Sequence, residues 1–171
     1  MRLTWTGLRR APVPDVVRAA VAEDRPLGWE VDIPTGETIV AATARLYAVR
    51  PDGEVALATP WHLVDGGTWD QDTSTLLVTF VDRSPARRWT FALDSDFPAT
   101  FRARVQASVV LMEVVEVGDR GSARVVVRKD LATQQLLTQA ILGRGVRSRD
   151  PGVKEALDAA LARVKEQVGL D

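Results

Sequence analysis

The sequence contains no cysteine and only one histidine, His62, and both shortages limit its chemistry. Without cysteine there is no disulfide, thiolate nucleophile, iron–sulfur cluster or cysteine-ligated zinc site, and a reducing compartment is permitted. One histidine is too few for a histidine-based metal centre. Carboxylates alone could still bind Mg²⁺ or Ca²⁺, but the chain has no D-x-D-x-D-G loop. We therefore predict no metal and no cofactor, and we assign no catalytic residue.

The sequence also lacks a basic excess and long apolar runs. Its 22 Lys and Arg residues face 23 Asp and Glu residues, for a net charge of −1. Residues 26–95 hold five basic and ten acidic residues, and residues 96–171 hold twelve and ten. Nucleic-acid-binding proteins normally carry a clear basic excess, so no nucleic-acid partner is expected. The N-terminus resembles neither a signal peptide nor a transmembrane segment, which favours a cytoplasmic location.

The composition suits one globular domain spanning residues 1–171. Its 46% hydrophobic and 26% charged residues are typical of a chain that buries a core. Residues 1–25 form an N-terminal extension in this interpretation, with a short helix predicted over 13–23. Strand-like segments separated by turn residues follow. We place five of them at 27–33, 38–49, 54–64, 74–82 and 87–94, with Trp89, Phe91 and Leu93 on one face of the last.

The second half of the chain mixes helices and strands. Phe97, Phe101 and Val105 recur at helical spacing, and Pro98 indicates a helix start. Two further strands are predicted over 108–117 and 122–129 with a turn at 118–121 between them. The composition of residues 134–143 allows a helix, whereas the strand–turn–strand pattern before this segment favours a strand.

The C-terminal helix gives the clearest signal. It is predicted over 151–168, with Asp150 as its cap and Gly169 at its end. Apolar side chains at helical spacing form a stripe along this helix, and the stripe must pack against another element, most simply a sheet. Because short turns connect the strands, they should pair antiparallel. We predict an α+β, mainly β fold: a bent antiparallel sheet or partly open barrel of about seven or eight strands, with a mid-chain helix and this amphipathic helix.

Four stretches of the chain carry a family resemblance. "TIVAATARLYAV", "PWHLVDGGTWD", "STLLVTFVD" and "RARVQASVVL" resemble, in that order, a group of small actinobacterial proteins. The match covers most of residues 27–129 and the final helix. Such sequences look like bacterial pleckstrin-homology-like or GRAM-like domains, which implies a bent antiparallel sheet or barrel closed by a helix. The resemblance implies no particular activity. His62 departs from it, because an acidic residue is common at that position.

The stretch "TPWHLVDGGTWD" (59–70) concentrates the candidate site residues. His62 could act as a general base oriented by Asp65 or Asp70, but the chain has no G-x-S-x-G nucleophile motif. Strand alternation instead assigns Trp61 to the core and His62 to the opposite, partly exposed face. Gly66-Gly67 predicts a bulge or bend, which leaves the face of Trp69 open. We name His62 and Trp69 as candidate binding residues.

Arginines supply the other candidate binding residues. Arg144, Arg147 and Arg149 precede the C-terminal helix and could bind a phosphate or an acidic partner, or could form a solvated face. Arg124 and Arg128 could join them. The acidic stretch "EVDIPTGET" disfavours a phosphoinositide-binding mouth at the first hairpin.

Three functional hypotheses follow from these observations. The leading one is a non-enzymatic interaction or scaffold domain that binds a protein partner or a second copy of itself. The alternative is an anion- or membrane-surface-binding module that uses the arginine cluster. The third is a hydrolase built around His62 and neighbouring carboxylates.

Overall fold

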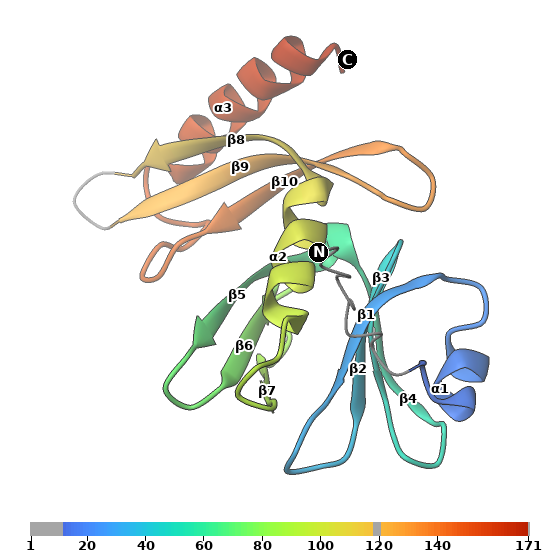
Figure 1. Cartoon of the computed structure of the whole chain (residues 1–171). Helices are drawn as coiled ribbons and strands as arrows, with labels where there is room; N and C mark the ends of the chain where they lie inside the picture. Colours follow the sequence, from blue (N-terminus) through green and yellow to red (C-terminus); the bar gives the residue numbers. More distant parts are fainter. Residues whose placement is uncertain (1–11, 118–120, 171) are drawn as a thin grey trace, which may run out of the picture.

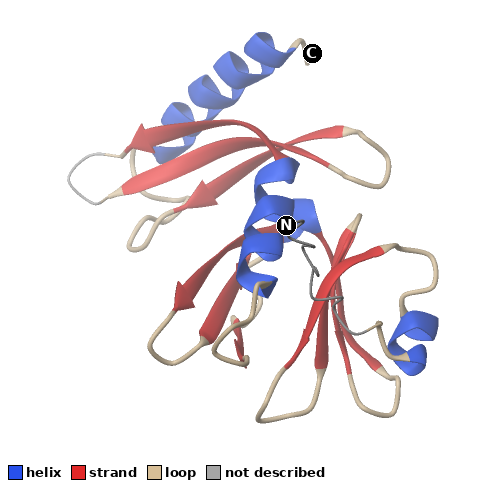
Figure 2. Cartoon of the chain, viewed as in Figure 1, coloured by secondary structure: helices blue, strands red, loops and turns tan. Residues whose placement is uncertain are grey.

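The computed structural model describes residues 12–117 and 121–170, and this part of the chain is mostly β. It contains three antiparallel sheets with ten strands, together with three α-helices (Figures 1 and 2). The three sheets do not close into one barrel, and the described strands outnumber the seven or eight that we predicted. The predicted turn at 118–121 falls largely on residues 118–120, which lie outside the described ranges.

The first sheet contains four strands in chain order. They are β1 (Pro26–Val31), β2 (Thr38–Ala42), β3 (Arg45–Val49) and β4 (Val55–Pro60). The prediction of one strand over 38–49 was wrong, because β2 and β3 form a hairpin. Both strands are apolar and buried, so the short turn between them leaves little trace in the hydropathy pattern. The Asp24 carboxylate stabilises this turn by accepting hydrogen bonds from the N–H groups of Ala44 and Arg45.

The second sheet contains three strands, also in chain order. They are β5 (Val64–Asp70), β6 (Thr75–Phe80) and β7 (Arg87–Thr90). The pairing of β5 with β6 shifts register between Val64 and Gly66, so the irregularity lies just before the glycines, whereas the predicted bulge or bend was at Gly66-Gly67. Gly66 and Gly67 themselves pair regularly with Thr79 and Val78. The first and second sheets meet where the buried Asp32 carboxylate accepts a 2.7 Å hydrogen bond from the Thr90 N–H. Asp32, from the acidic stretch, therefore holds the corner between the two sheets.

Helix α2 (Phe97–Ser108) covers the core of these two sheets, as its apolar spacing predicts. Phe97 and Phe101 are buried, and Pro98 lies in the first turn of the helix. Leu93 does not share the buried face of Trp89 and Phe91, because β7 ends at Thr90 and strand alternation ends with it. Leu93 is 87% exposed, which corrects that prediction.

The third sheet lies beyond α2 and has the order β10-β9-β8 (Figure 1). Its strands are β8 (Val109–Glu116), β9 (Ser122–Lys129) and β10 (Leu136–Leu142), so the stretch 134–143 contains a strand. Helix α3 (Val153–Val168) packs its apolar stripe on this sheet, as predicted. Figure 1 shows α3 on the side of the sheet that faces away from the rest of the molecule.

Helix α1 and the start of helix α3 differ in detail from the prediction. Helix α1 (Asp15–Ala20) is shorter than expected and buries Val17 against the outer face of the first sheet. Gly152, in the left-handed conformation, precedes α3 as its cap residue, so Asp150 is not the cap. The Asp150 carboxylate instead accepts a hydrogen bond from the Arg147 N–H. Gly169 ends the helix with φ of 70°, as expected of a glycine C-cap.

Candidate functional site

The stretch 59–70 is interrupted by a short 3₁₀-helix, η1 (Trp61–Leu63), between β4 and β5. Trp61 is buried, and its indole N–H donates a 2.9 Å hydrogen bond to the Ala42 carbonyl. The core role expected for Trp61 is therefore correct, although it does not lie in a strand. His62 is not the partly exposed strand residue that we predicted, because the helical turn breaks the alternation. Its side chain is only 12% exposed.

The carboxylate that lies near His62 is that of Asp130, not that of Asp65 or Asp70 as expected. His62 Nδ1 lies 4.0 Å from the Asp130 carboxylate and has no hydrogen-bond partner among the described residues. Asp65 binds Arg124, and the carboxylate of Asp70 accepts hydrogen bonds from the N–H groups of its own turn. Hydrogen bonding from the Ala132 N–H, aided by the nearby His62, lowers the pKa of Asp130. The structure thus assembles no His62–Asp65 or His62–Asp70 pair.

Arg124 and Arg128 of β9 both contact Asp65 of β5, at the junction between the second and third sheets. Arg128 is 2% exposed and donates hydrogen bonds to Ser108 Oγ at 2.9 Å and to the Asp65 carbonyl at 3.2 Å. Burial lowers its pKa, while the Asp65 charge opposes that effect. Arg124 binds the same carboxylate at 3.0 Å. These two arginines therefore cannot serve as the free anion-binding cations of the prediction.

Arg144 and Arg147 line a shallow pocket of about 460 Å³, and the structure adds Arg83 to them. Arg149 is exposed but does not line this pocket. Arg83 comes from the loop after β6 and adopts a φ of 61°, in the left-handed region. Sequence reasoning missed Arg83, because nothing in its local pattern indicates proximity to the loop before α3.

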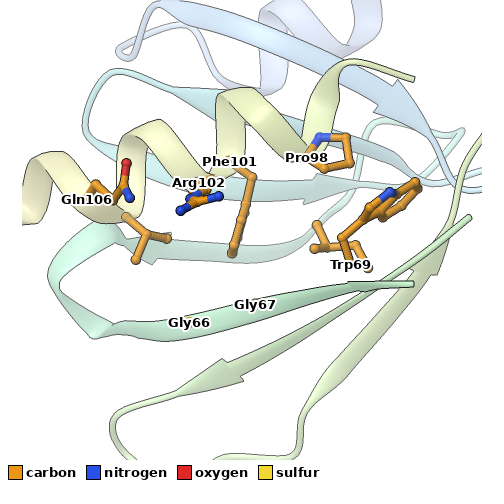
Figure 3. A pocket seen from close by; sticks show the side chains of 9 residues that line it. Gly66, Gly67, Trp69, Pro98, Phe101, Arg102 and Gln106 are labelled. Carbon is orange, nitrogen blue, oxygen red and sulfur yellow. The ribbon is translucent and has the colours of Figure 1, made fainter. Parts of the chain in front are cut away.

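A more apolar pocket, of about 340 Å³, opens between β5 and α2 (Figure 3). Phe101 points from α2 towards β5, where a Cβ atom on Gly67 would lie 2.5 Å from Phe101 Cε1. Trp69, at one end of the pocket, stacks on Phe91 with 6.3 Å between ring centroids. The complete lining is Gly66, Gly67, Trp69, Leu76, Pro98, Phe101, Arg102, Val105 and Gln106.

Strand β5 is an edge strand of its sheet, and beyond Asp65 no described strand pairs with its outer side. Hydrogen bonding alternates along an antiparallel ladder. The Phe91 N–H donates to the Ser74 carbonyl, which makes Ser74 and Phe91 a hydrogen-bonded pair beside β6 and β7. When the alternation is followed from this pair through β6 to β5, the main-chain N–H and C=O groups of Gly67 and Trp69 point away from β6, to the open edge. Of the predicted binding residues, only Trp69 lies at this pocket. The sequence analysis placed Phe101 and Val105 on one helix face without a binding role, and it did not identify the exposed Arg102.

Comparisons with protein-family models, with curated proteins and with solved structures found no match. Within residues 12–117 and 121–170, no three His, Asp or Glu side chains gather where they could hold a metal ion. No helix in those ranges is long and apolar enough to cross a membrane. The geometry of the two pockets is therefore what bears on function.

Proposed function

We propose that this chain is a non-enzymatic interaction domain with a pleckstrin-homology-like fold, and that it binds an extended segment of a partner protein between β5 and α2. The observation that carries the proposal is the apolar pocket beside an unpaired strand edge. Extended peptides bind in this way by adding a strand to a sheet edge, while side-chain pockets provide specificity.

The order of the elements supports the proposed fold. Four antiparallel strands, three antiparallel strands and a helix follow one another from Pro26 to Ser108. The resemblance to pleckstrin-homology-like domains implies a bent antiparallel sheet or barrel closed by a helix, and α2, which follows these strands and covers their core, would be that helix. The third sheet and α3 are then an addition after the helix that covers the two sheets.

The chemistry of the pocket defines the peptide that it would accept. The outward main-chain groups of Gly67 and Trp69 suit pairing with an extended backbone. Phe101, Leu76 and Val105 provide an apolar surface for one bulky side chain. Arg102 lines the pocket and is exposed, so its positive charge favours an acidic residue next to that side chain.

The test is selection of binders from a random peptide library displayed on phage, followed by NMR titration of the selected peptides. We expect peptides with an aromatic or aliphatic residue beside an acidic one. Binding should shift the amide signals of Gly67 and Trp69. N-methylation of those peptide amides that pair with β5 should abolish binding, because it removes these hydrogen-bond donors.

Two arginine variants make the test specific. Arg102→Glu should weaken binding and reduce the preference for acidic peptides, whereas Arg87→Glu, an exposed arginine on β7, should leave both unchanged. Selected peptides that bind the wild type and Arg102→Glu equally well, or that shift amides elsewhere only, would overturn the proposal. So would selection of no peptide at all.

A second candidate function is binding of an anion, such as a phosphate group, at Arg83, Arg144 and Arg147. The favouring observation is that Arg83 lines one pocket together with Arg144 and Arg147, which come from a loop distant from it in the chain. Titration with inorganic phosphate should shift the Gly143 and Gly145 amides, less so at high salt. Arg144→Gln should weaken this effect and Arg149→Gln should not. Binding to phosphatidylserine vesicles without any response to phosphate would indicate a membrane surface instead, and no response to either would exclude this function.

A further inference from the structure

His62 is the only histidine of the chain, and neither the peptide site nor the anion site proposed above uses it. It lies in η1, which joins β4 of the first sheet to β5 of the second, and its side chain is largely buried. The Nδ1 atom is buried and has no hydrogen-bond partner among the described residues. Buried polar atoms nearly always have a partner, so an unpaired one requires an explanation.

The loop between β9 and β10 brings a carboxylate to this atom. Asp130 begins the loop, its side chain is only 22% exposed, and its Oδ1 lies 4.0 Å from His62 Nδ1. That distance is too long for a hydrogen bond, but it allows an ion pair once the imidazole carries a proton. Histidine is the side chain that changes its charge near neutral pH. Asp130 stays ionised there, because hydrogen bonding from the Ala132 N–H, aided by His62, lowers its pKa.

The same β9–β10 hairpin holds the third sheet against the first two. Leu131 of its loop packs on the core that α2 covers, and Gln139 of β10 donates a 2.7 Å hydrogen bond to the His62 carbonyl. His62 and Asp130 therefore lie on opposite sides of the junction. We propose that gain of a proton by His62 closes an ion pair with Asp130 and locks this hairpin onto η1. The third sheet is then held more firmly at mildly acidic pH than above neutral pH.

The other charged groups on the elements around η1 have partners or positions of their own. Hydrogen bonds engage Asp24, Asp65, Asp70, Arg104, Arg124 and Arg128. Arg45 lies beside Tyr47, and Arg102 lines the β5–α2 pocket. Lys129 alternates with Arg128, so it belongs to the α3 face of β9. Strands β4 and β10 carry no charged residue. Asp130 is therefore the charged group that the structure places against the imidazole.

Spin labels can report on the junction directly, because the natural chain contains no cysteine that would also be labelled. One label is attached at Ala140→Cys in β10 and the other at Gln71→Cys in the β5–β6 turn, and both positions are exposed. Pulsed electron double resonance should give one narrow distance distribution at about pH 5.5 and an added broad component at about pH 8. We expect the ratio of narrow to broad populations to fall about fivefold, as for the loss of an ion pair of modest strength.

Two variants of the labelled protein decide whether His62 and Asp130 cause the change. His62→Gln and Asp130→Asn should each give the same distance distribution at both pH values, whereas Asp94→Asn, in an exposed turn, should keep the pH dependence. A label pair within the first two sheets, at Gln71→Cys and Leu93→Cys, should not respond to pH. An unchanged distribution in the otherwise natural chain, or a change that survives in His62→Gln, would overturn the proposal. No peptide is present, so the result is independent of binding in the β5–α2 pocket.

Discussion

Arg128 joins three elements of the structure through one side chain. Its guanidinium group reaches Ser108 at the end of α2 and the main chain of Asp65 in β5, while its own backbone belongs to β9. A buried charge requires such partners, because removing it from water is costly. The same residue type on an alternating strand is ordinarily exposed, which is why the sequence suggested a surface cation.

Arg128→Met should destabilise the protein, because the apolar side chain leaves the buried Ser108 hydroxyl and the Asp65 carbonyl without these hydrogen bonds. We expect a loss of about 3 kcal/mol in the free energy of unfolding, measured by urea denaturation. Arg124→Met removes the more exposed partner of Asp65 and should cost less than about 1 kcal/mol. Equal losses in the two variants would show that the Arg128 contacts are not the important ones.

Asp130 should make stability depend on acidic pH. Hydrogen bonding from the Ala132 N–H lowers its pKa below the ordinary 3.8 in the folded state, so its ionised form stabilises the fold. This contribution is complete above the ordinary pKa and is lost as pH falls through the lower, folded-state pKa. Thermal unfolding followed from neutral to strongly acidic pH should therefore show a shallower acid decline for Asp130→Asn than for the wild type. Asp94→Asn, in an exposed turn, should follow the wild type.

At the scale of elements, most strands and both longer helices could be predicted from their apolar spacing. The failures have a common physical cause, which is a change of direction inside an apolar run. Residues 38–49 turn at Thr43 and Ala44, and residues 54–64 turn at η1. Neither turn is marked by glycine, since the Asp24 carboxylate stabilises the first and η1 follows Pro60 in the second. A period-two pattern that crosses such a turn assigns the following side chains to the wrong face.

The packing of α2 on β5 can be tested with two adjacent glycines. Gly67→Ala should destabilise the protein by about 1–3 kcal/mol, because its Cβ would overlap the buried Phe101 ring and push α2 from the strand. A Cβ at Gly66 meets nothing within 4 Å, so Gly66→Ala should change stability by no more than about 0.5 kcal/mol. Thermal unfolding measures both. A destabilised Gly66→Ala would mean that the edge of β5 is less open than the structure indicates.

At the scale of the whole molecule, the apolar residues divide into separate cores. One core lies between α2 and the first two sheets, and another lies between α3 and the third sheet. Their junction includes polar contacts, in which Asp65 binds Arg124, and Gln139 donates to the His62 carbonyl at 2.7 Å.

Weakening one core should therefore loosen its own sheet first. Leu157→Ala should cost about 2–5 kcal/mol and accelerate amide hydrogen exchange in β8, β9 and β10 before it affects β2 and β3. Val78→Ala, in the other core, should accelerate exchange in β5 and β6 first. If both variants accelerate exchange uniformly over the chain, the two cores unfold as one unit.

The sequence by itself determined most of the extended segments and both longer helices, because strand and helix periods depend only on neighbouring residues. It determined the mid-chain helix and the apolar stripe of α3. Only the tertiary structure decided how strands divide among three sheets, which carboxylate meets which arginine, and that Trp69 shares a pocket with Phe101. Those outcomes depend on contacts between residues distant in the chain, and no local pattern encodes them.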